Sequence, residues 1–573
     1  MIDIDGQEND RKRYSELIIN TPARKKIIVA GAGTGKTFTF QELLRGKNGD
    51  ALALTFINNL ANDLKNDLDG LAESQTFHGY CIKLLHRAPF GGINADFLIF
   101  PKLPKIIKSD EQILFGRKSN FEEAFQCLIE EDDRIKFYIN RANFYNAVGF
   151  NDSVYRVLQY FKSGSGEPPQ YEQVVIDEFQ DFNRLEVAFI VEMEKVNPIL
   201  IVGDDDQAIY DWKNASSDFI REKAKDYDYE RFELPYCSRC TEVIVDAVDD
   251  IITHAKANGN LTDRVDKKYT CYLPKKLQDC RNYPKIIYAI CSVHTKRRSP
   301  YISMYIEREI QKIPREEIDL ANENGYPCVL IIGPRHYLSQ INEFLVNESY
   351  KLDYEEKKKD NNLHILDGYK ILLKDGESNL GWRIILEFDK VENRNDIIGM
   401  THTDQVDIVE QLPEGYRCKH EKVIDLLNHL KENTASIEEQ NELKKIIDLD
   451  LNEIKNQHGI KEEGETEESQ NADSQEMGQP SIKLTTFQGC KGLSGGFVFI
   501  VGLNDGTIPM KPHFPTDNEV CQFIVALTRA RKKCYLISNR GFGKEYGLSP
   551  SKFINWIDEP RLSIEEVNKE YFK

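Results

Sequence analysis

A glycine-rich loop between a strand-like run and a helix-compatible stretch most constrains the fold of this chain. The strand-like run is Ile27–Val29, the loop with its Lys-Thr end spans residues 30–37, and the stretch Phe38–Leu44 follows. Glycines let backbone N–H groups turn inward around phosphate oxygens, and a helix N-terminus adds partial positive charge at the same point. This order predicts a phosphate-binding P-loop in an α/β fold. Its candidate binding residues are Ala30, Gly31, Ala32, Gly33, Thr34, Gly35, Lys36 and Thr37.

Two carboxylates follow a second strand-like run, Val174–Ile176, at the end where open α/β sheets place their ligands. Asp177 can hold Mg²⁺ there, together with the hydroxyl of Thr37, because both offer oxygen ligands. The neighbouring Glu178 can accept a proton from water. The pair therefore predicts chemistry on a phosphate that the P-loop holds.

A third strand-like run, Ile199–Val202, leads into a polar segment that ends in Gln207. The neutral amide of Gln207 can contact a γ-phosphate or the water that attacks it. Lys36 would reach the β- and γ-phosphates from the P-loop. The ends of three strand-like runs thus carry residues suited to a nucleoside triphosphate.

An aromatic residue and a cation are adjacent in the segment after this third run. Trp212 precedes Lys213, and Tyr210 lies just before them. An aromatic ring beside a cation is a common grip on single-stranded nucleic acid, and each stacked base contributes roughly 1–3 kcal/mol. The polar neighbours Asp211 and Asn214 favour an exposed Trp212 over the alternative, an aromatic residue of the core.

Charge and length limit the class of protein. The net charge of −19 argues against a protein that coats nucleic acid through bulk positive charge. A local basic groove stays compatible with it, because salt screens charges beyond about 8–10 Å. The 573 residues suggest roughly three to four domains. Residues 461–480 are rich in carboxylates and poor in apolar residues, which predicts a flexible, solvated linker.

The N-terminus and the cysteines bear on the compartment. Residues 1–13 contain no apolar signal core, and no apolar run is long enough for a transmembrane helix, so we expect a cytoplasmic protein without a membrane partner. The 12 cysteines are scattered, which suits a reducing compartment. Cys237 and Cys240 have the spacing of a metal-binding pair, but no second such pair follows. Ordinary thiols are therefore favoured over the alternative, a zinc or iron–sulfur cluster that His294 could join.

Six further segments accompany the P-loop and the carboxylate pair between residues 30 and 531. They are Leu54–Asn58, Thr76–His78, Gly203–Trp212, Ser238–Cys240, Thr486–Leu493 and Val525–Arg531. In this order the chain resembles the UvrD/Rep/PcrA family of superfamily-one DNA helicases. Val525–Arg531 is similar to the last motif of that family almost letter for letter. Any one of these segments could arise by chance, whereas all eight in the family's order could hardly do so.

The resemblance implies an α/β fold with two RecA-like P-loop NTPase cores and mainly helical insertions in each. A strand-like run at 329–332 supports a core sheet there, and helix-like spacing at 366–373 and 379–386 predicts helices in the second insertion. The implied bounds are 1–88 and 168–234 for the first core, 89–167 for its insertion, 235–350 and 481–573 for the second core, and 351–480 for its insertion, with the acidic linker 461–480.

The resemblance also implies the cofactors ATP and Mg²⁺ and a motor that moves 3′ to 5′ on single-stranded or forked DNA. Such a DNA helicase or translocase would serve repair, replication or recombination. Its catalytic residues would be Lys36, Glu178, Gln207, Arg239 and Arg529, and its DNA contacts Phe56, Asn58, His78 and Trp212. The two arginines would reach the γ-phosphate from the second core, so hydrolysis requires closure of the two cores.

Several positions depart from the family pattern. Ser15 and Ser238 stand where the family has the glutamine and tyrosine that contact adenine, which leaves the choice between ATP and another nucleoside triphosphate open. Gln488, Ser494 and Lys213 replace a histidine, a glutamate and an arginine of the family. These departures leave an alternative open: a helicase-like, DNA-stimulated ATPase that acts as the nucleic-acid sensor of a multi-protein complex, such as a phage-defence system, with an unidentified protein partner.

Overall fold

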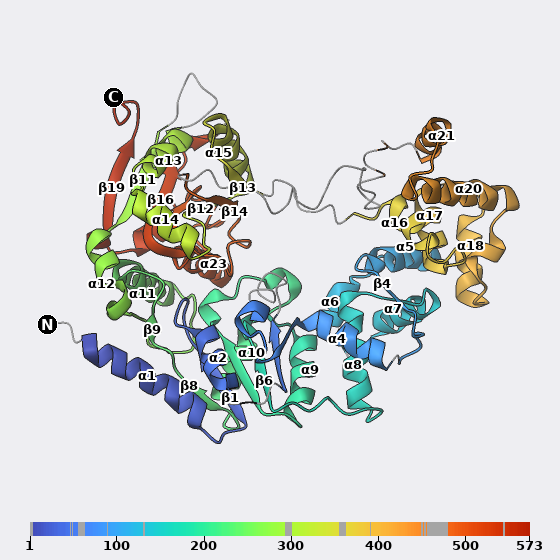
Figure 1. Cartoon of the computed structure of the whole chain (residues 1–573), viewed down its shortest axis with the longest axis horizontal. Coiled ribbons are helices and arrows are strands. Elements are labelled where there is room, and N and C mark those ends of the chain that lie inside the picture. Colours follow the sequence, from blue (N-terminus) through green and yellow to red (C-terminus); the bar gives the residue numbers. More distant parts are fainter. Residues whose placement is uncertain are drawn as a thin grey trace. The chain divides into compact units, whose positions relative to one another are not determined.

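Six parallel strands form the sheet that carries the P-loop in the computed structural model (Figure 1). In sheet order they are β3 (Glu73–Thr76), β2 (Ala51–Thr55), β6 (Gln173–Ile176), β7 (Ile199–Gly203), β1 (Lys25–Val29) and β8 (Glu230–Phe232). Strands β2, β6 and β7 are buried along their whole length, as is typical of parallel strands covered on both faces. The strands predicted at 27–29, 174–176 and 199–202 are confirmed.

Several helices accompany this sheet, and one of them begins at the end of the P-loop. They are α1 (Ile4–Asn20), α2 (Lys36–Arg45), α4 (Phe77–Arg87), α9 (Arg184–Glu194) and α10 (Asp218–Lys225). α2 begins at Lys36 and buries Phe40 and Leu44 in the core of the sheet, so the helix predicted over 38–44 is confirmed. A capping box of Asn183 and Glu186 begins α9. We call this sheet with its helices the first core.

A second parallel sheet has seven strands. Their order is β13 (Leu352–Tyr354), β14 (Ile482–Thr485), β12 (Val329–Ile332), β15 (Gly495–Ile500), β16 (Ala530–Asn539), β11 (Ile286–Cys291) and β19 (Leu562–Val567). Its helices are α11 (Glu242–Ala257), α12 (Leu273–Asn282), α13 (Tyr301–Gln311), α14 (Arg315–Glu323), α15 (Arg335–Asn347) and α23 (Asp517–Leu527). The strand predicted at 329–332 is confirmed by β12. We call this sheet with its helices the second core.

Short elements complete the two cores. β9 (Tyr236–Cys237) pairs with β10 (Thr270–Cys271), and β17 (Gly541–Phe542) pairs with β18 (Glu545–Tyr546). Single 3₁₀ turns span Phe179–Asp181, Asp205–Gln207, Asp211–Lys213, Lys552–Trp556 and Glu559–Arg561. Three of these turns follow strands β6 and β7, so the polar segments after the strands are held in fixed conformations.

Both cores belong to one unit of the chain, residues 1–80, 168–358 and 475–573, and a second unit comprises residues 81–167 and 359–474. The second unit is mainly helical, and we call it the helical unit. Its elements are β4 (Leu98–Ile99), α5 (Leu103–Phe115), α6 (Phe121–Gln126), α7 (Asp133–Phe144), β5 (Ala147–Val148), α8 (Phe150–Lys162), α16 (Ile365–Leu372), α17 (Asn379–Phe388), α18 (Arg394–Thr403), α19 (Ile408–Gln411), α20 (Glu414–Lys431) and α21 (Ile437–Ile447). The helices predicted at 366–373 and 379–386 are confirmed by α16 and α17.

The structure describes most of the chain. The described residues are 4–45, 47, 50–55, 64–88, 90–129, 132–292, 301–354, 362–389, 391–447, 451, 454, 479–542 and 545–573. The predicted DNA contacts Phe56 and Asn58, the potential metal ligand His294 and all but the end of the linker 461–480 lie outside them.

The fold class is α/β, with two parallel sheets and many helices, consistent with two RecA-like helicase domains. Among the residues described, no helix combines the length and the apolar character needed to cross a membrane. The division into cores and insertions at the bounds given above stays a proposal.

Candidate nucleotide-binding site

Hydrogen bonds to its own backbone carbonyls hold the P-loop in a tight turn. Gly33 and Gly35 adopt left-handed conformations, with φ of 69° and 92°, which a glycine adopts without steric cost. The hydroxyl of Thr34 donates to the carbonyl of Gly31 at 3.0 Å. Lys36 Nζ donates to the carbonyl of Ala30 at 3.2 Å. The loop therefore presents its backbone and its ammonium group at the N-terminus of α2, where phosphate binding is favourable.

Asp177 and Glu178 stand at the end of β6 with different electrostatic surroundings. Glu178 has a left-handed backbone, with φ of 54°, which is strained for a residue other than glycine. Burial and the neighbouring Glu178 raise the pKa of Asp177 to about 7. Burial would also raise the pKa of Glu178, but Lys491 and Lys36 outweigh it and hold that pKa below its usual value. Glu178 is therefore ionised near neutral pH and able to accept a proton.

A chain of hydrogen bonds leads from Glu178 to Gln207. Gln180 Nε2 donates to Glu178 Oε2 at 2.5 Å, and Gln180 Oε1 accepts the backbone N–H of Asp204 at 2.9 Å. The carboxylate of Asp204 accepts Gln207 Nε2 at 2.5 Å, and Gln207 Oε1 accepts Arg529 Nη2 at 3.0 Å. The ends of strands β6 and β7 are thus linked to an arginine of the second core.

Arg529 is positioned by the end of α23. This helix begins with a capping box and is buried over most of its length, and Arg529 lies between its C-cap and strand β16. Arg529 is 2% exposed, and its Nε donates to the carbonyl of Val525 at 2.8 Å. Because the guanidinium is fixed by the backbone of its own core, it projects toward the first core in one defined direction.

The segment around Arg239 packs directly on the P-loop. The backbone N–H and the hydroxyl of Ser238 both donate to the carbonyl of Gly33, at 2.9 and 3.2 Å. A Cβ atom at Gly33 would collide with the side chain of Arg239. Arg239 Nη1 donates to the carbonyl of Thr528. Ser238, which replaces a tyrosine of the family pattern, therefore holds the P-loop through its backbone and hydroxyl.

One cavity of about 350 Å³ collects these groups, a size in the range of about 300–1,000 Å³ that small-molecule sites have. Its lining includes Ala32, Gly33, Thr34, Gly35, Lys36, Thr37, Asp177, Glu178, Gln207, Arg239 and Arg529. Ala30 and Gly31 do not line it, and their carbonyls instead accept Lys36 and Thr34. All five predicted catalytic residues and both predicted Mg²⁺ ligands therefore meet at one place.

The donor set of the cavity suits a hard divalent cation. The hydroxyl of Thr37 and the carboxylate of Asp177 both line it, and Mg²⁺ prefers such oxygen ligands. The raised pKa of Asp177 shows that its charge is poorly compensated by the protein alone. A cation at this point would supply the missing compensation, so the residues present fit Mg²⁺.

A second, smaller pocket adjoins the P-loop at Thr34 and Gly35. It is lined by Ser15 and by Arg11, Tyr14, Phe38, Thr39, Leu234, Pro235 and Tyr236. Ser15 therefore lies beside the P-loop, next to Thr34 and Gly35. Gln7, the glutamine upstream of the P-loop in the sequence, contacts another segment: its amide oxygen accepts the backbone N–H of Leu273 at 3.0 Å.

The described DNA-contact candidates lie apart from the cavity. Trp212 is 74% exposed, and Tyr210 contacts it edge to face with 6.4 Å between ring centroids. The Nε2 atom of His78 lies 3.9 Å from Glu186, and burial lowers the pKa of His78. Lys213, the cation next to Trp212 in the sequence, is buried instead: it is 3% exposed and its Nζ lies 3.7 Å from Glu186 Oε2. The carboxylate inside the first core draws the ammonium group away from solvent.

Sequence reasoning missed several residues around the cavity. Lys491 Nζ lies 2.6 Å from Asp181 Oδ2 and donates to the carbonyl of Gln207 at 2.7 Å. Gln180 is the central link of the chain described above. Both belong to recognisable segments, the Asp-Glu-Phe-Gln-Asp run and Thr486–Leu493, so the signal was present. Asp67, Lys275, Gly492 and Arg531 also line the cavity.

The cysteines are free thiols. The Sγ atom of Cys237 accepts the backbone N–H of Cys240, and the Sγ atoms of Cys271 and Cys280 lie 3.9 Å apart. Within the described ranges, the residues whose ligand atoms gather closely enough for a metal ion are Asp204, Asp205 and Asp206, and no cysteine belongs to such a group.

Comparison with known proteins identifies the family. The model of the UvrD/REP helicase N-terminal domain matches residues 13–132 and 108–228, and the model of the UvrD-like helicase C-terminal domain matches residues 348–541. The chain is 26% identical to the "Probable DNA helicase II homolog" of Mycoplasma capricolum subsp. capricolum, over 97% of this chain and 88% of that protein. It is 22% identical to the ATP-dependent DNA helicase PcrA of Staphylococcus aureus strain Mu50, over 96% of this chain and 86% of that protein. DNA helicase II of Haemophilus influenzae is 27% identical over 45% of this chain and 41% of that protein.

Proposed function

Because the chain belongs to the UvrD/REP helicase family, we propose that it is an ATP-driven motor that moves 3′ to 5′ on single-stranded DNA and separates forked duplexes. One observation carries this proposal: catalytic candidates from both cores line a single cavity. Lys36, Glu178 and Gln207 come from the first core, whereas Arg239 and Arg529 come from the second. A site built from two cores can respond to their relative movement, as a motor requires.

Glu178 is the base of the proposed reaction. Its lowered pKa keeps it ionised, and Gln180 fixes one of its carboxylate oxygens at 2.5 Å. It would accept a proton from the water that attacks the γ-phosphate. Asp177 would instead hold Mg²⁺ with Thr37, and the bound cation would neutralise charge on the phosphate oxygens.

The arginines of the second core would complete the site. Lys36 would turn from the carbonyl of Ala30 to the β- and γ-phosphates when the nucleotide enters. Arg529 already contacts Gln207, and Arg239 lines the same cavity, which supports a role for both in stabilising the charge that would develop on the transferring phosphoryl group. Arginines in this role are worth about 10³–10⁵ in rate.

Hydrolysis is coupled to DNA through the segment that follows Gln207. The hydroxyl of Tyr210 donates to the carbonyl of Gln488 at 3.3 Å, which links the two cores beside the cavity. This contact uses the backbone of Gln488, so it is independent of the replacement of the family's histidine. Trp212 lies just beyond with an exposed ring on which a base can stack. Movement of the second core would thus displace the DNA contact.

The test is ATP hydrolysis with and without a single-stranded oligodeoxynucleotide, for the wild type and for Glu178→Gln. We expect DNA to stimulate the wild type and the variant to lose about 10²–10⁴ in kcat while it still binds nucleotide. Glu222→Gln is the matched control, because Glu222 is an exposed carboxylate in the same core. Equal hydrolysis with and without DNA in the wild type would remove the motor from consideration.

Unwinding separates this proposal from the second candidate, a DNA-stimulated ATPase that senses nucleic acid within a larger complex. Ser494 favours keeping this candidate, because its hydroxyl accepts Arg531 Nε at 3.0 Å, whereas the family has a ribose-contacting glutamate at this position. A forked duplex with a labelled strand is the direct assay. Strand separation by the chain alone supports the helicase, and stimulated hydrolysis without separation supports the sensor.

A further inference from the structure

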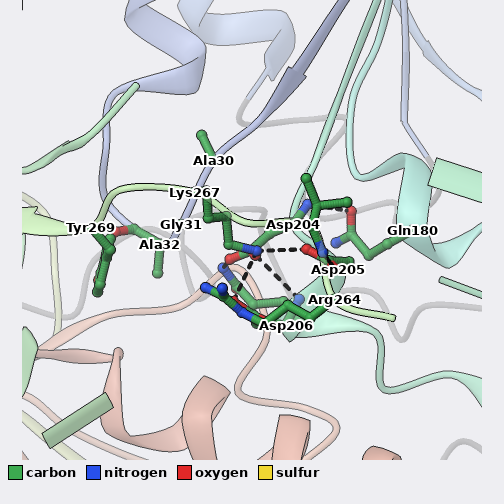
Figure 2. Close-up of polar contacts among 12 residues, drawn as sticks. Ala30, Gly31, Ala32, Gln180, Asp204, Asp205, Asp206, Arg264, Lys267 and Tyr269 are labelled. Atoms are coloured by element: carbon green, nitrogen blue, oxygen red, sulfur yellow. Dashed lines mark hydrogen bonds and ion pairs between the residues drawn. The ribbon is translucent and has the colours of Figure 1, made fainter. Parts of the chain in front are cut away.

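Lys267 is a buried cation of the second core that the proposed mechanism leaves without a role. It lies between α11 and β10, and its side chain is 2% exposed. Its Nζ atom lies 2.5 Å from Asp204 Oδ1, 2.6 Å from Asp205 Oδ1 and 2.8 Å from Asp206 Oδ2. Figure 2 shows the ammonium group between the three carboxylates.

We infer that Lys267 is a positioning residue for ATP hydrolysis, which acts by fixing the carboxylate of Asp204. The inference rests on the proposed function. Asp204 is the point at which the chain of hydrogen bonds divides: its carboxylate orients Gln207, and its backbone N–H orients Gln180, which holds Glu178. Lys267 would therefore align the γ-phosphate sensor and the base together.

Asp204 depends on Lys267 more than the other two carboxylates do. Asp206 also pairs with Arg264 at 2.7 Å, and Asp205 also pairs with Arg221 at 3.3 Å. Among the residues that the structure describes, Lys267 is the one cation within ion-pair distance of Asp204. Removal of this ammonium group would leave Asp204 ionised beside two like charges, so its carboxylate would turn away or take up a proton.

The surroundings of Lys267 tie it to the P-loop as well. Two residues further on, the hydroxyl of Tyr269 donates to the carbonyl of Ala32 at 3.0 Å, and the Tyr269 ring fills the space where a Cβ atom of Gly31 would lie (Figure 2). The backbone N–H of Val265 donates to Asp205 Oδ2 at 2.8 Å. The segment 264–269 of the second core therefore contacts both the P-loop and the residues that follow β7.

This arrangement makes the alignment conditional on closure. Lys267 belongs to the second core, and its three partners belong to the first. Separation of the cores would remove the cation from three buried carboxylates, whereas closure supplies the cation and orders Gln207. The active arrangement of the base and the sensor would thus form only when the second core is seated.

The experiment compares Lys267→Met with the wild type in DNA-stimulated ATP hydrolysis. Methionine keeps the length and the apolar stem of lysine but removes the charge. We expect kcat to fall about 10²-fold, as small misplacements of catalytic groups do, with the KM for ATP within about threefold because the P-loop contacts remain. Lys256→Met is the matched control, because Lys256 is an exposed lysine of the preceding helix α11 that pairs with Asp266.

A double-mutant cycle with Gln207→Ala distinguishes positioning from general destabilisation. If Lys267 acts through Asp204 on Gln207, the loss in the double variant is much smaller than the product of the two single losses. Losses that multiply, or an unchanged kcat in Lys267→Met, overturn the inference. The proposed function fails separately, when the wild type itself shows no hydrolysis that DNA stimulates.

A charge-balanced variant guards against misfolding. Lys267→Met together with Asp204→Asn removes one charge of each sign and leaves Asp205 and Asp206 with their arginines. We expect this variant to fold with a melting temperature near that of the wild type and still to show the low kcat. Wild-type kcat in this folded variant would overturn the inference.

Discussion

The two units each contain a buried cluster of aspartates and cations, and the two clusters join different kinds of segment. In the unit of the cores, Lys267 lies among Asp204, Asp205 and Asp206. In the helical unit, Asp110 lies between Arg141 and Arg383, at 2.8 and 2.6 Å. The first cluster joins segments that belong to two different sheets, whereas the second joins helices α5, α7 and α17 of one bundle.

The ratio of charges differs as well. Asp110 has two arginines and also accepts the hydroxyl of Tyr145 at 2.6 Å, so every oxygen of its carboxylate is engaged. Burial opposes its charge, but the two arginines hold the pKa of Asp110 below its usual value. In the cluster of the cores, three carboxylates share Lys267, and Arg221 and Arg264 pair in addition with Asp205 and Asp206. The third carboxylate, Asp204, orients the catalytic candidate Gln207. The same interaction is therefore expected to stabilise a fold in one case and to position a reaction in the other.

We expect the largest effect on ATP hydrolysis from Arg529, which is linked to Asp204 of the cluster through Gln207. Arg529→Ala removes the guanidinium that contacts Gln207, and we expect single-turnover ATP hydrolysis to slow by about 10³–10⁵. The matched control is Arg540→Ala. Arg529 directly precedes strand β16 and Arg540 directly follows it, but Arg540 forms an exposed pair with Glu566. An Arg529→Ala protein that hydrolyses ATP at the wild-type rate would contradict the role of the second core in the site.

For Arg383 we expect a loss of stability without a loss of ATP hydrolysis. Arg383→Ala leaves Asp110 buried with one arginine, and breaking a buried pair costs about 3–5 kcal/mol. We expect faster hydrogen exchange in peptides from α5, α7 and α17, with kcat for ATP unchanged at temperatures where the variant stays folded.

The control for Arg383 is Arg417→Ala. Arg417 forms a largely exposed pair with Glu421 on α20, and solvent screening leaves such pairs little weight in stability. A large loss of kcat in Arg383→Ala without faster exchange would show that the cluster of the helical unit also acts on catalysis, and the contrast between the two clusters would be lost.

The same contrast explains what the sequence could predict. Ile27–Val29, Val174–Ile176 and the P-loop are local patterns, because each residue's environment is set by its neighbours along the chain. They predicted strands, a helix and an edge of the sheet, and the structure confirms these elements. The roles given to Lys36, Glu178 and the arginines remain predictions, although these residues meet in one cavity.

The remaining features depend on contacts between distant segments. Lys267 lies in a run without a recognisable pattern, and its partner Asp204 is 63 residues away. Lys213 stands beside an aromatic residue, as in a nucleic-acid grip, yet Glu186 of α9 holds it inside the core. A local pattern cannot reveal where a long side chain ends when the charge that attracts it comes from another element.

The smallest expected effect is the pH dependence of stability due to Asp152, a second buried aspartate of the helical unit. Asp152 is buried, and within the described part of the chain Arg156 is the one cation in an ion pair with it, with its Nε 3.6 Å away. Burial outweighs this pair and raises the pKa of Asp152 to about 7, whereas its unfolded value is about 3.9. Between these values the folded state holds a proton that the unfolded state has released. Stability therefore falls as pH rises from about 4 to 7, by at most about 1.4 kcal/mol per pH unit.

Hydrogen exchange of peptides from α8 between pH 5 and pH 8, corrected for the intrinsic rate, measures this dependence. We expect the opening free energy of α8 to decline with pH in the wild type and to be nearly flat in Asp152→Asn, which carries no titrating proton at this position. Asp133→Asn should keep the wild-type slope, because Asp133 is exposed at the start of α7. An unaltered slope in Asp152→Asn would assign the dependence to another group. In that case a single arginine would compensate a buried aspartate as well as the pair around Asp110 does.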